Sequence, residues 1–258
     1  MRTALANNVL EFPKIKMPDV PVFEDTDDEE DDGRIGKQYT VYPIKDKAYI
    51  EKIREYLLYN RTNRERPKYE NRRNCAAFSI GIHLSLRGSD FCKMRVSDFL
   101  DTNRDGSHVW ASKKVFIEQK TGKKRTIYYS PTVIQLVADW IKQEGLGRND
   151  YLFRSQRPWK DKDGNIHEHM NRHSFCEILR EAGRAVGYPL PLGTHSLRKT
   201  FCYHAYMEAK QEDKSQVIVT LQRLLNHTSP LITFRYLGFE DKDVQAMFNS
   251  VSLCQGIS

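Results

Sequence analysis

A series of helix-type hydrophobic patterns, interrupted once by a β-type stretch, runs between residues 42 and 240 and constrains the fold more than any other feature. Apolar residues three and seven positions apart predict a helix over residues 45–59, because that spacing places them on one face. The apolar stretch 75–86 predicts a second, buried helix, although its ambiguous period leaves a strand open. The polar residues 60–73 between them predict a loop. The pattern favours a mainly α fold (α+β) over an alternating βαβ fold.

The β-type stretch predicts one small antiparallel sheet. Residues 109–117 and 125–129 are rich in β-branched and aromatic side chains, and Thr121-Gly122 between them suits a turn, so together they predict a hairpin. A charged segment at 154–168 predicts a further loop. Capping residues and helical spacing predict more helices, which begin near Ser130, before Phe175, at Thr194 and at Ser215, and a short one that begins at Ser229-Pro230 and carries Tyr236.

Charge is distributed unevenly along the chain. The formal net charge is +7, but residues 24–32 hold eight acidic residues in nine positions, which leaves +15 on the rest. A body this basic is expected to bind a polyanion, usually nucleic acid, although charge alone supports a basic surface without a partner equally well. Residues 1–40 contain three prolines and the acidic run. They therefore predict a disordered tail or linker.

Neither a membrane span nor a disulfide framework is expected. No apolar run approaches the ~18 residues that suggest a membrane span, and the N-terminus lacks the apolar core of a secretory signal. The five cysteines are scattered and form no CxxC pair. Such a set is typical of reduced thiols in a cytoplasmic protein.

The C-terminal third carries residue types that can break a phosphodiester without a metal. His195 and Arg198 are three residues apart and share a helix face, and Tyr236 lies nine residues after His227. A guanidinium can clamp two phosphate oxygens, an imidazole can exchange a proton near neutral pH, and a phenol can act as a covalent nucleophile. An isolated HxxR pair or a lone tyrosine is a weak signal, and only the order and spacing together favour this chemistry.

This ordered set resembles the tyrosine recombinase (phage integrase) family. The family reads Leu-Leu-Gly-His-Ser where this chain has Leu-Leu-Asn-His-Thr-Ser at 224–229, again with the nucleophilic Tyr nine residues beyond the His. Ser85-Leu86-Arg87 resembles its Gly-Leu-Arg, with Ser85 in place of a glycine that relieves a tight turn. Lys120-Thr-Gly-Lys-Lys-Arg resembles its hairpin Lys-x-x-Lys-x-Arg. By this resemblance the catalytic residues are Arg87, Lys120, His195, Arg198, His227 and Tyr236, and the DNA contacts are Lys123, Lys124 and Arg125.

The resemblance implies a helical catalytic domain over residues 41–240, with a small antiparallel β-sheet, in a site-specific DNA recombinase. Tyr236 would attack a DNA phosphate to give a 3′-phosphotyrosine link and a free 5′-hydroxyl, and Lys120 would protonate the leaving oxygen. No cofactor or metal is expected. ATP is not expected either, because the phosphotyrosine link stores the bond energy. The implied partners are double-stranded DNA, a homo-oligomer on DNA, as a tetramer, and accessory DNA-bending or partner recombinase proteins. The implied location is cytoplasmic and nucleoid-associated.

Both ends of the chain raise further expectations. Family members usually carry a separate core-binding domain before the catalytic one, and only residues 1–40 precede it here, so we expect that clamp to be missing or supplied by a partner. Residues 241–258 predict a C-terminal helix or tail with an apolar stripe. The stripe either packs on its own domain or, as in the family, docks on a neighbouring protomer. Its residues are Val244, Met247, Phe248 and Val251.

Other functions remain open at the level of sequence. One is a sequence-specific DNA-binding regulator with a recombinase-like fold that has lost catalysis, and another is a relaxing type IB topoisomerase. The pairs His167/His169 and Cys202/His204 could suggest a metal site. Neither pair has a closing partner at the spacing of zinc ligands.

Overall fold

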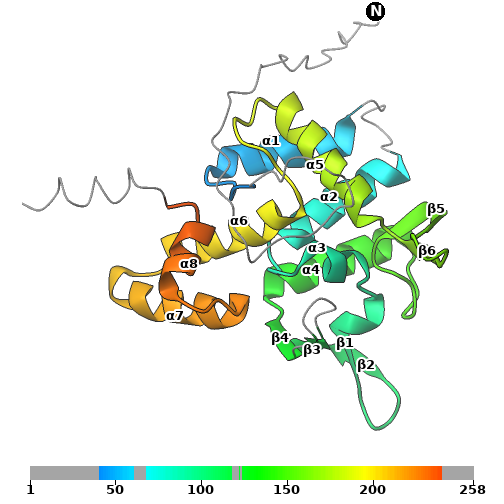
Figure 1. The fold of residues 1–258 in the computed structure, drawn as a ribbon. Helices are drawn as coiled ribbons and strands as arrows, with labels where there is room; N and C mark the ends of the chain where they lie inside the picture. Colours follow the sequence, from blue (N-terminus) through cyan, green and yellow to red (C-terminus); the bar gives the residue numbers. More distant parts are fainter. Residues whose placement is uncertain (1–40, 61–67, 118–121, 123, 240–258) are drawn as a thin grey trace, which may run out of the picture.

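The computed structural model describes residues 41–60, 68–117, 122 and 124–239, and both the tail at 1–40 and the predicted C-terminal helix at 241–258 lie outside this part (Figure 1). The α-helices are α1 (Lys47–Tyr59), α2 (Tyr69–Gly81), α3 (Gly88–Cys92), α4 (Pro131–Glu144), α5 (Arg172–Ala185), α6 (Thr194–Met207), α7 (Lys214–Leu225) and α8 (Pro230–Tyr236). Two 3-10 helices are η1 (Val96–Phe99) and η2 (Gln211–Asp213). The strands are β1 (Leu100–Thr102), β2 (His108–Trp110), β3 (Lys113–Ile117), β4 (Lys124–Tyr128), β5 (Arg154–Lys160) and β6 (Ile166–His169). The fold is mainly helical, as predicted.

The strands form three separate two-stranded antiparallel sheets in the described residues, β1–β2, β3–β4 and β5–β6, where the sequence predicted one sheet. The predicted hairpin is present as β3–β4, in which Val115 pairs with Thr126 and Ile117 with Lys124. The predicted strand 109–117 is split between two sheets, because its first part pairs with β1, where the Ala111 N–H also donates to the Phe99 carbonyl, and its second part pairs with β4. The predicted loop at 154–168 was wrong, since β5 and β6 pair across it.

Helix α2 corrects a second boundary. It begins at Tyr69 and so includes residues 69–73, which the sequence predicted as loop, and it ends at Gly81 instead of continuing to residue 86. The charge of Arg73 made this stretch resemble a polar loop in the sequence. In the structure its guanidinium is buried and donates to the Arg154 carbonyl and the Asn74 side chain. Such internal acceptors let a charged residue face the core.

Capping residues fix several helix ends. Ser130 accepts a hydrogen bond from Val133 N–H, and Gly145 ends α4 at φ +62°, as the sequence predicted. The predicted caps of α6 and α7 shift by one and two residues, because Gly193 and Asp213 occupy the N-cap positions instead of Thr194 and Ser215.

Buried apolar side chains form two separate clusters. The larger one, the main core, includes side chains from α1 to α5 and reaches α6 at Leu197. The smaller one, the terminal core, begins at Cys202 of α6 and is completed by Ile218, Leu221, Leu225, Tyr236 and Leu237. Figure 1 shows α7 and α8 at one side of the molecule, joined to the body through α6. We call this part, from Cys202 to Leu237, the terminal lobe.

An extended segment before α1, residues 41–46, lies across α6 and is named the N-terminal strap. Ile44 N–H donates to Thr200 Oγ1 at 2.8 Å, and the Ile44 carbonyl lies 3.0 Å from His204 Nε2. Lys45 Nζ donates to the Gly238 carbonyl at 2.7 Å, just beyond the end of α8. The strap therefore connects the start of the described chain to the end of the terminal lobe.

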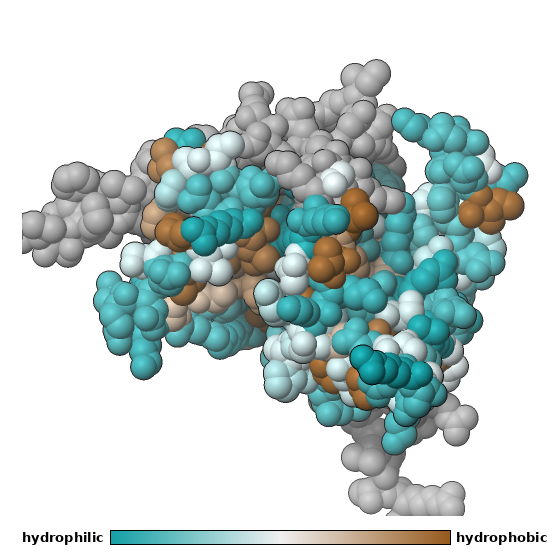
Figure 2. Space-filling view, turned by 90° about the horizontal axis from the view of Figure 1, so that it is seen from below, coloured by the Kyte–Doolittle hydropathy of each residue, from teal (hydrophilic) through white to brown (hydrophobic). Residues whose placement is uncertain are grey.

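The surface is mostly polar on the face drawn in Figure 2, where hydrophobic residues form small patches separated by hydrophilic ones. None of the helices in the described part of the chain combines the length and apolar character needed to span a bilayer.

Candidate active site

Arg198 lies on α6 at the junction of the two cores. Leu197 before it packs in the main core and Cys202 after it belongs to the terminal core, so the guanidinium is only 2 % exposed. Its Nε and Nη1 atoms have no hydrogen-bond partner among the described residues. A buried guanidinium without acceptors is costly, and an anion such as a phosphate oxygen would satisfy it.

His195 stands half-buried in the first turn of the same helix. The N-terminal end of a helix favours negative charge, because its first N–H groups point outward unsatisfied. The three-residue spacing places His195 on the same side of α6 as Arg198, as the sequence predicted.

Arg87 reaches this end of α6 through a close approach of α3. It is the N-cap residue of α3 and is almost fully buried. A Cβ on the next residue, Gly88, would lie 2.5 Å from Thr194 Oγ1 and 2.6 Å from Thr194 Cβ. Only glycine allows α3 and the start of α6 to pack this tightly. The packing brings Arg87 to the end of α6 that carries His195.

The turn before Arg87 is held by the hairpin. Ser85 adopts φ +51°, a conformation that favours glycine, so this chain makes the tight turn with serine in place of the glycine. Arg125 of β4 is buried and donates from Nη2 to the Ser85 carbonyl at 2.7 Å. We predicted Arg125 as a DNA contact, but this geometry gives its guanidinium an internal role, as a brace between β4 and the turn.

The other cations of the hairpin are only partly described. Lys124 begins β4 and is exposed. Lys120 and Lys123 lie between the paired residues Ile117 and Lys124 and fall outside the described residues.

His227 and Tyr236 are brought together by the turn between α7 and α8. Asn226 ends α7 in the left-handed conformation, at φ +62°, and His227 follows. His227 Nδ1 lies 3.1 Å from Thr233 Oγ1, and its ring centroid lies 5.1 Å from that of Tyr236 at an interplanar angle of 67°. Tyr236 is 3 % exposed and its hydroxyl is shielded from solvent. The predicted pair is thus in contact, with the phenol inside the terminal core.

Lys199 is a residue that the sequence analysis missed. It lies on α6, is 5 % exposed, and places Nζ 4.8 Å from the centroid of the Tyr236 ring. Its position four residues after His195 was an available signal, because that spacing also shares a helix face.

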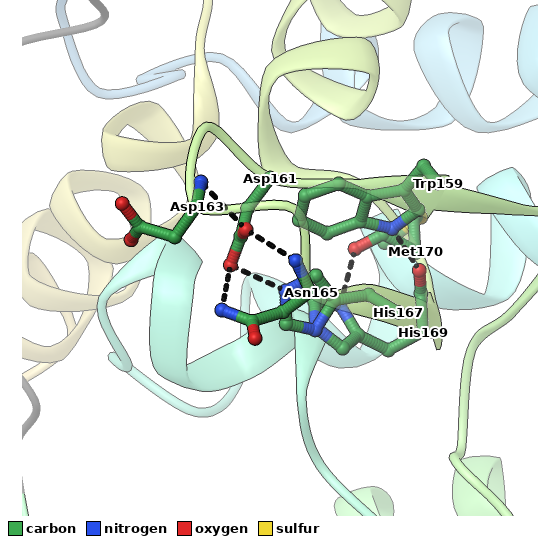
Figure 3. A network of polar contacts seen from close by, with 7 residues as sticks. All are labelled: Trp159, Asp161, Asp163, Asn165, His167, His169 and Met170. Atoms are coloured by element: carbon green, nitrogen blue, oxygen red, sulfur yellow. Dashed lines mark hydrogen bonds and ion pairs between the residues drawn. The ribbon is translucent and has the colours of Figure 1, made fainter.

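The histidines that suggested a metal site have structural partners in the β5–β6 hairpin (Figure 3). His167 Nε2 lies 2.9 Å from Asp161 Oδ2, and His169 Nδ1 lies 2.9 Å from the Met170 carbonyl. The Asp161 carboxylate also accepts the N–H groups of Asp163 and Asn165, and these contacts, His167 first, hold its pKa well below the usual range. No group of three or more His, Cys, Asp or Glu side chains suited to a metal occurs in the described ranges.

Cys202 also lacks the features of a ligand. It is fully buried in the terminal core, and burial raises the pKa of its thiol. Its Sγ lies 3.6 Å from Ser85 Oγ, so it packs α6 against the turn before Arg87.

Known proteins resemble this chain in sequence and in fold. The family model described as "Phage integrase family" matches residues 47–242. A curated protein of Bacillus subtilis (strain 168), "Probable integrase/recombinase YoeC", is 35% identical over 210 residues, which is 81% of this chain and 96% of the relative. Among solved structures, XerA recombinase aligns with a TM-score of 0.53 at 17% identity over 84% of this chain and 66% of its own. XerH site-specific recombinase, bound to its difH substrate, aligns with a TM-score of 0.51 at 16% identity over 83% of this chain and 55% of its own.

Proposed function

Because this chain belongs to the phage integrase family and is a site-specific tyrosine recombinase, we propose that it cuts and rejoins double-stranded DNA through a covalent link to Tyr236. The observation that carries this assignment is the buried Arg198 guanidinium, which has two N–H-bearing atoms without a partner among the described residues. It lies one residue from Lys199, which contacts the Tyr236 ring. A phosphate bound to Arg198 would therefore sit near the nucleophile.

The cations around α6 match the charge of the reacting phosphate. Attack on a phosphodiester spreads negative charge over its nonbridging oxygens, and without a metal fixed donors must stabilise that charge. Arg198 and Arg87 would each hold phosphate oxygens, and His195 would add a hydrogen bond at the positive end of the α6 dipole. Arg125 braces the turn before Arg87 through the Ser85 carbonyl, and Lys199 contacts the Tyr236 ring.

In the proposed first step, Tyr236 gives its hydroxyl proton to His195 while its oxygen attacks phosphorus, and the bond from phosphorus to the 5′ oxygen breaks. The products are a 3′-phosphotyrosine and a free 5′-hydroxyl, and Lys120 is proposed as the acid that protonates the leaving oxygen. Reversal by the same hydroxyl, or by one from a partner strand, restores the DNA. The shielded hydroxyl of Tyr236 has to leave the terminal core before it can attack.

The assembly and location are part of the same proposal. We propose that the protein acts as a homo-oligomer on DNA, as a tetramer around a four-way junction, with accessory DNA-bending or partner recombinase proteins and in association with the nucleoid. Lys123 and Lys124 are proposed phosphate contacts at the hairpin, since lysines near a basic site favour DNA backbones.

A suicide DNA substrate tests the nucleophile. Tyr236→Phe keeps the ring but removes the attacking oxygen, so we expect DNA binding close to wild type and no covalent adduct on a denaturing gel. Tyr206→Phe is the matched control, because Tyr206 packs in the same lobe through aromatic contacts to Phe234 and Phe239. It should retain the adduct.

A regulator that has lost catalysis would bind DNA and give no adduct even as the wild-type chain. An adduct that persists in Tyr236→Phe would instead assign the nucleophile to another residue.

A further inference from the structure

Lys199 combines burial with an unusual neighbour. An ammonium group is seldom buried unless nearby groups compensate for the lost hydration. Here Nζ lies over the face of the Tyr236 ring, 4.8 Å from its centroid, at a residue that is 5 % exposed. The negative face of an aromatic ring attracts a cation, and the attraction is stronger where water is excluded.

The Tyr236 ring is held from two elements at once. Lys199 approaches its face from α6, and the His227 ring contacts it at an interplanar angle of 67° from the α7–α8 turn. His227 is in turn oriented by its 3.1 Å contact with Thr233 Oγ1, and Thr233 is fully buried. The ring therefore has a fixed place between these two groups.

A cation at this position also acts on the chemistry. When tyrosine attacks, its oxygen loses a proton, and when the DNA is rejoined it departs as a phenolate. A positive charge beside the ring stabilises the negative form more than the neutral one, by Coulomb attraction through a low-dielectric interior. Arg198 and Lys199 are consecutive residues of α6. The helix would therefore present the Arg198 cation to the phosphate and the Lys199 cation to the nucleophile.

We propose that Lys199 is a positioning residue of the cleavage reaction, which orients the Tyr236 ring and stabilises its ionised form. The proposal rests on Tyr236 being the nucleophile. Among charged or titratable groups of the described residues, Lys199 faces the ring from α6 and His227 from the α7–α8 turn, while Arg235, next to Tyr236 in α8, is exposed.

The chain supplies a matched control within the same lobe. Lys214 places Nζ 5.2 Å from the centroid of the Tyr206 ring, a similar cation–π contact to a tyrosine outside the proposed chemistry. Lys199→Met and Lys214→Met remove the charge and keep a similar side-chain volume. Lys199→Arg keeps the charge.

The experiment measures single-turnover cleavage of a suicide DNA substrate at saturating protein, across pH, with peptide mapping of the adduct. For Lys199→Met we expect about a tenfold slower cleavage or more, by the strength of a desolvated cation–π contact, with DNA affinity unchanged. The pH at which the rate reaches half its plateau should move upward. Lys199→Arg should recover most of the rate, and Lys214→Met should match wild type.

A ring-fluorinated tyrosine at position 236 separates ionisation from packing. Fluorine makes the phenol ionise more readily, so the defect of Lys199→Met should shrink in the fluorinated protein, which a purely structural role would not produce. If Lys199→Met does not fold, Lys199→Gln takes its place in the same assays.

Three results would overturn the proposal. Unchanged rate and pH profile in Lys199→Met would remove any role in cleavage. Weaker DNA binding with an unchanged saturated rate would make Lys199 a phosphate ligand. An equal defect in Lys214→Met would reduce both contacts to packing. If the adduct instead maps to another residue, the assignment of Tyr236 fails, independently of how Lys199 behaves.

Discussion

Arg87 and Tyr236 are held in the molecule in two different ways. Arg87 stands at the rim of the main core, where Leu86 and Phe91 on either side of it are buried and fix the backbone. Tyr236 is itself a member of the much smaller terminal core. The arginine is placed by a backbone that the main core holds, whereas the tyrosine must give up buried contacts to expose its hydroxyl. For the proposed reaction, the comparison predicts that the half of the site that would bind phosphate is preformed and that the half that would supply the nucleophile rearranges.

Cavities in the two cores should have the largest effects. Phe175→Ala in the main core is expected to cost about 3–5 kcal/mol and Leu221→Ala in the terminal core about 2–5 kcal/mol, since both side chains are buried. We expect Phe175→Ala to lower protection throughout the molecule in amide hydrogen exchange. Leu221→Ala should lower this protection mainly in α7 and α8.

If Leu221→Ala instead lowers protection equally in α2, α4 and α5, the two cores unfold as one unit. The contrast between the halves would then be wrong.

Two buried arginines sharpen the idea of a preformed anion site. Arg198→Met removes a buried charge with two N–H-bearing atoms unpartnered in the described residues, so we expect the free energy of unfolding to rise by about 1–3 kcal/mol. Cleavage should fall about 10²–10³-fold. Arg73→Met is the control, because it removes hydrogen bonds to the Arg154 carbonyl and to the Asn74 side chain and should lose about 1–3 kcal/mol.

Denaturant titration and the suicide-substrate assay measure both quantities. A loss of stability in Arg198→Met comparable with that in Arg73→Met would mean that Arg198 is a structural residue in the free protein.

A substitution in the turn before Arg87 tests the side of the site that the main core holds, and its expected effect is smaller. Ser85 adopts φ +51°, so Ser85→Gly should relieve strain and raise the melting temperature, by about 0.5–1 kcal/mol in free energy. The brace from Arg125 reaches the backbone carbonyl and survives the change. Ser85→Ala is the control, because it removes the hydroxyl and keeps the strain. A lower stability for Ser85→Gly than for Ser85→Ala would show that the conformational freedom glycine adds to the unfolded chain outweighs the strain relieved at this turn.

The smallest expected effect concerns pH and the β5–β6 hairpin. Burial lowers the pKa of His169, so the unfolded chain takes up a proton more readily than the folded one. Its contribution to stability is therefore present above the unfolded value of about 6.5 and is lost as the pH falls toward the folded pKa. Denaturation between pH 7 and pH 5 should show a decline that His169→Gln reduces. His108→Gln, at an exposed histidine, should leave the decline unchanged.

Local patterns in the sequence predicted much of the fold. The helix at 45–59, the hairpin around Thr121-Gly122 and the turn at Ser85 all depend on side-chain spacing or backbone preference within a few residues. The β5–β6 hairpin was not predicted, because its strands are polar and depend on contacts such as the hydrogen bond from Trp159 Nε1 to the His169 carbonyl. Hydrophobic alternation does not detect such a pair.

The site followed the same division. Spacing predicted His195 and Arg198 on one helix and His227 beside Tyr236. It did not predict that Arg125 turns inward to Ser85 or that Lys199 covers the Tyr236 ring. Those contacts join residues that are 40 and 37 positions apart, and only the packing of elements brings them together.

The N-terminal strap brings the first described residues into contact with the chain that follows α8. Ile44 binds α6 at Thr200 and His204, and Lys45 binds the carbonyl of Gly238, two residues beyond Tyr236. This contact lies just beyond the end of α8, where Gly238, at φ +74°, is packed against Pro43. A displacement of the strap would thus reach both α6 and the residues that follow the helix carrying Tyr236. A displaced α8 would in turn loosen the chain where it enters the domain.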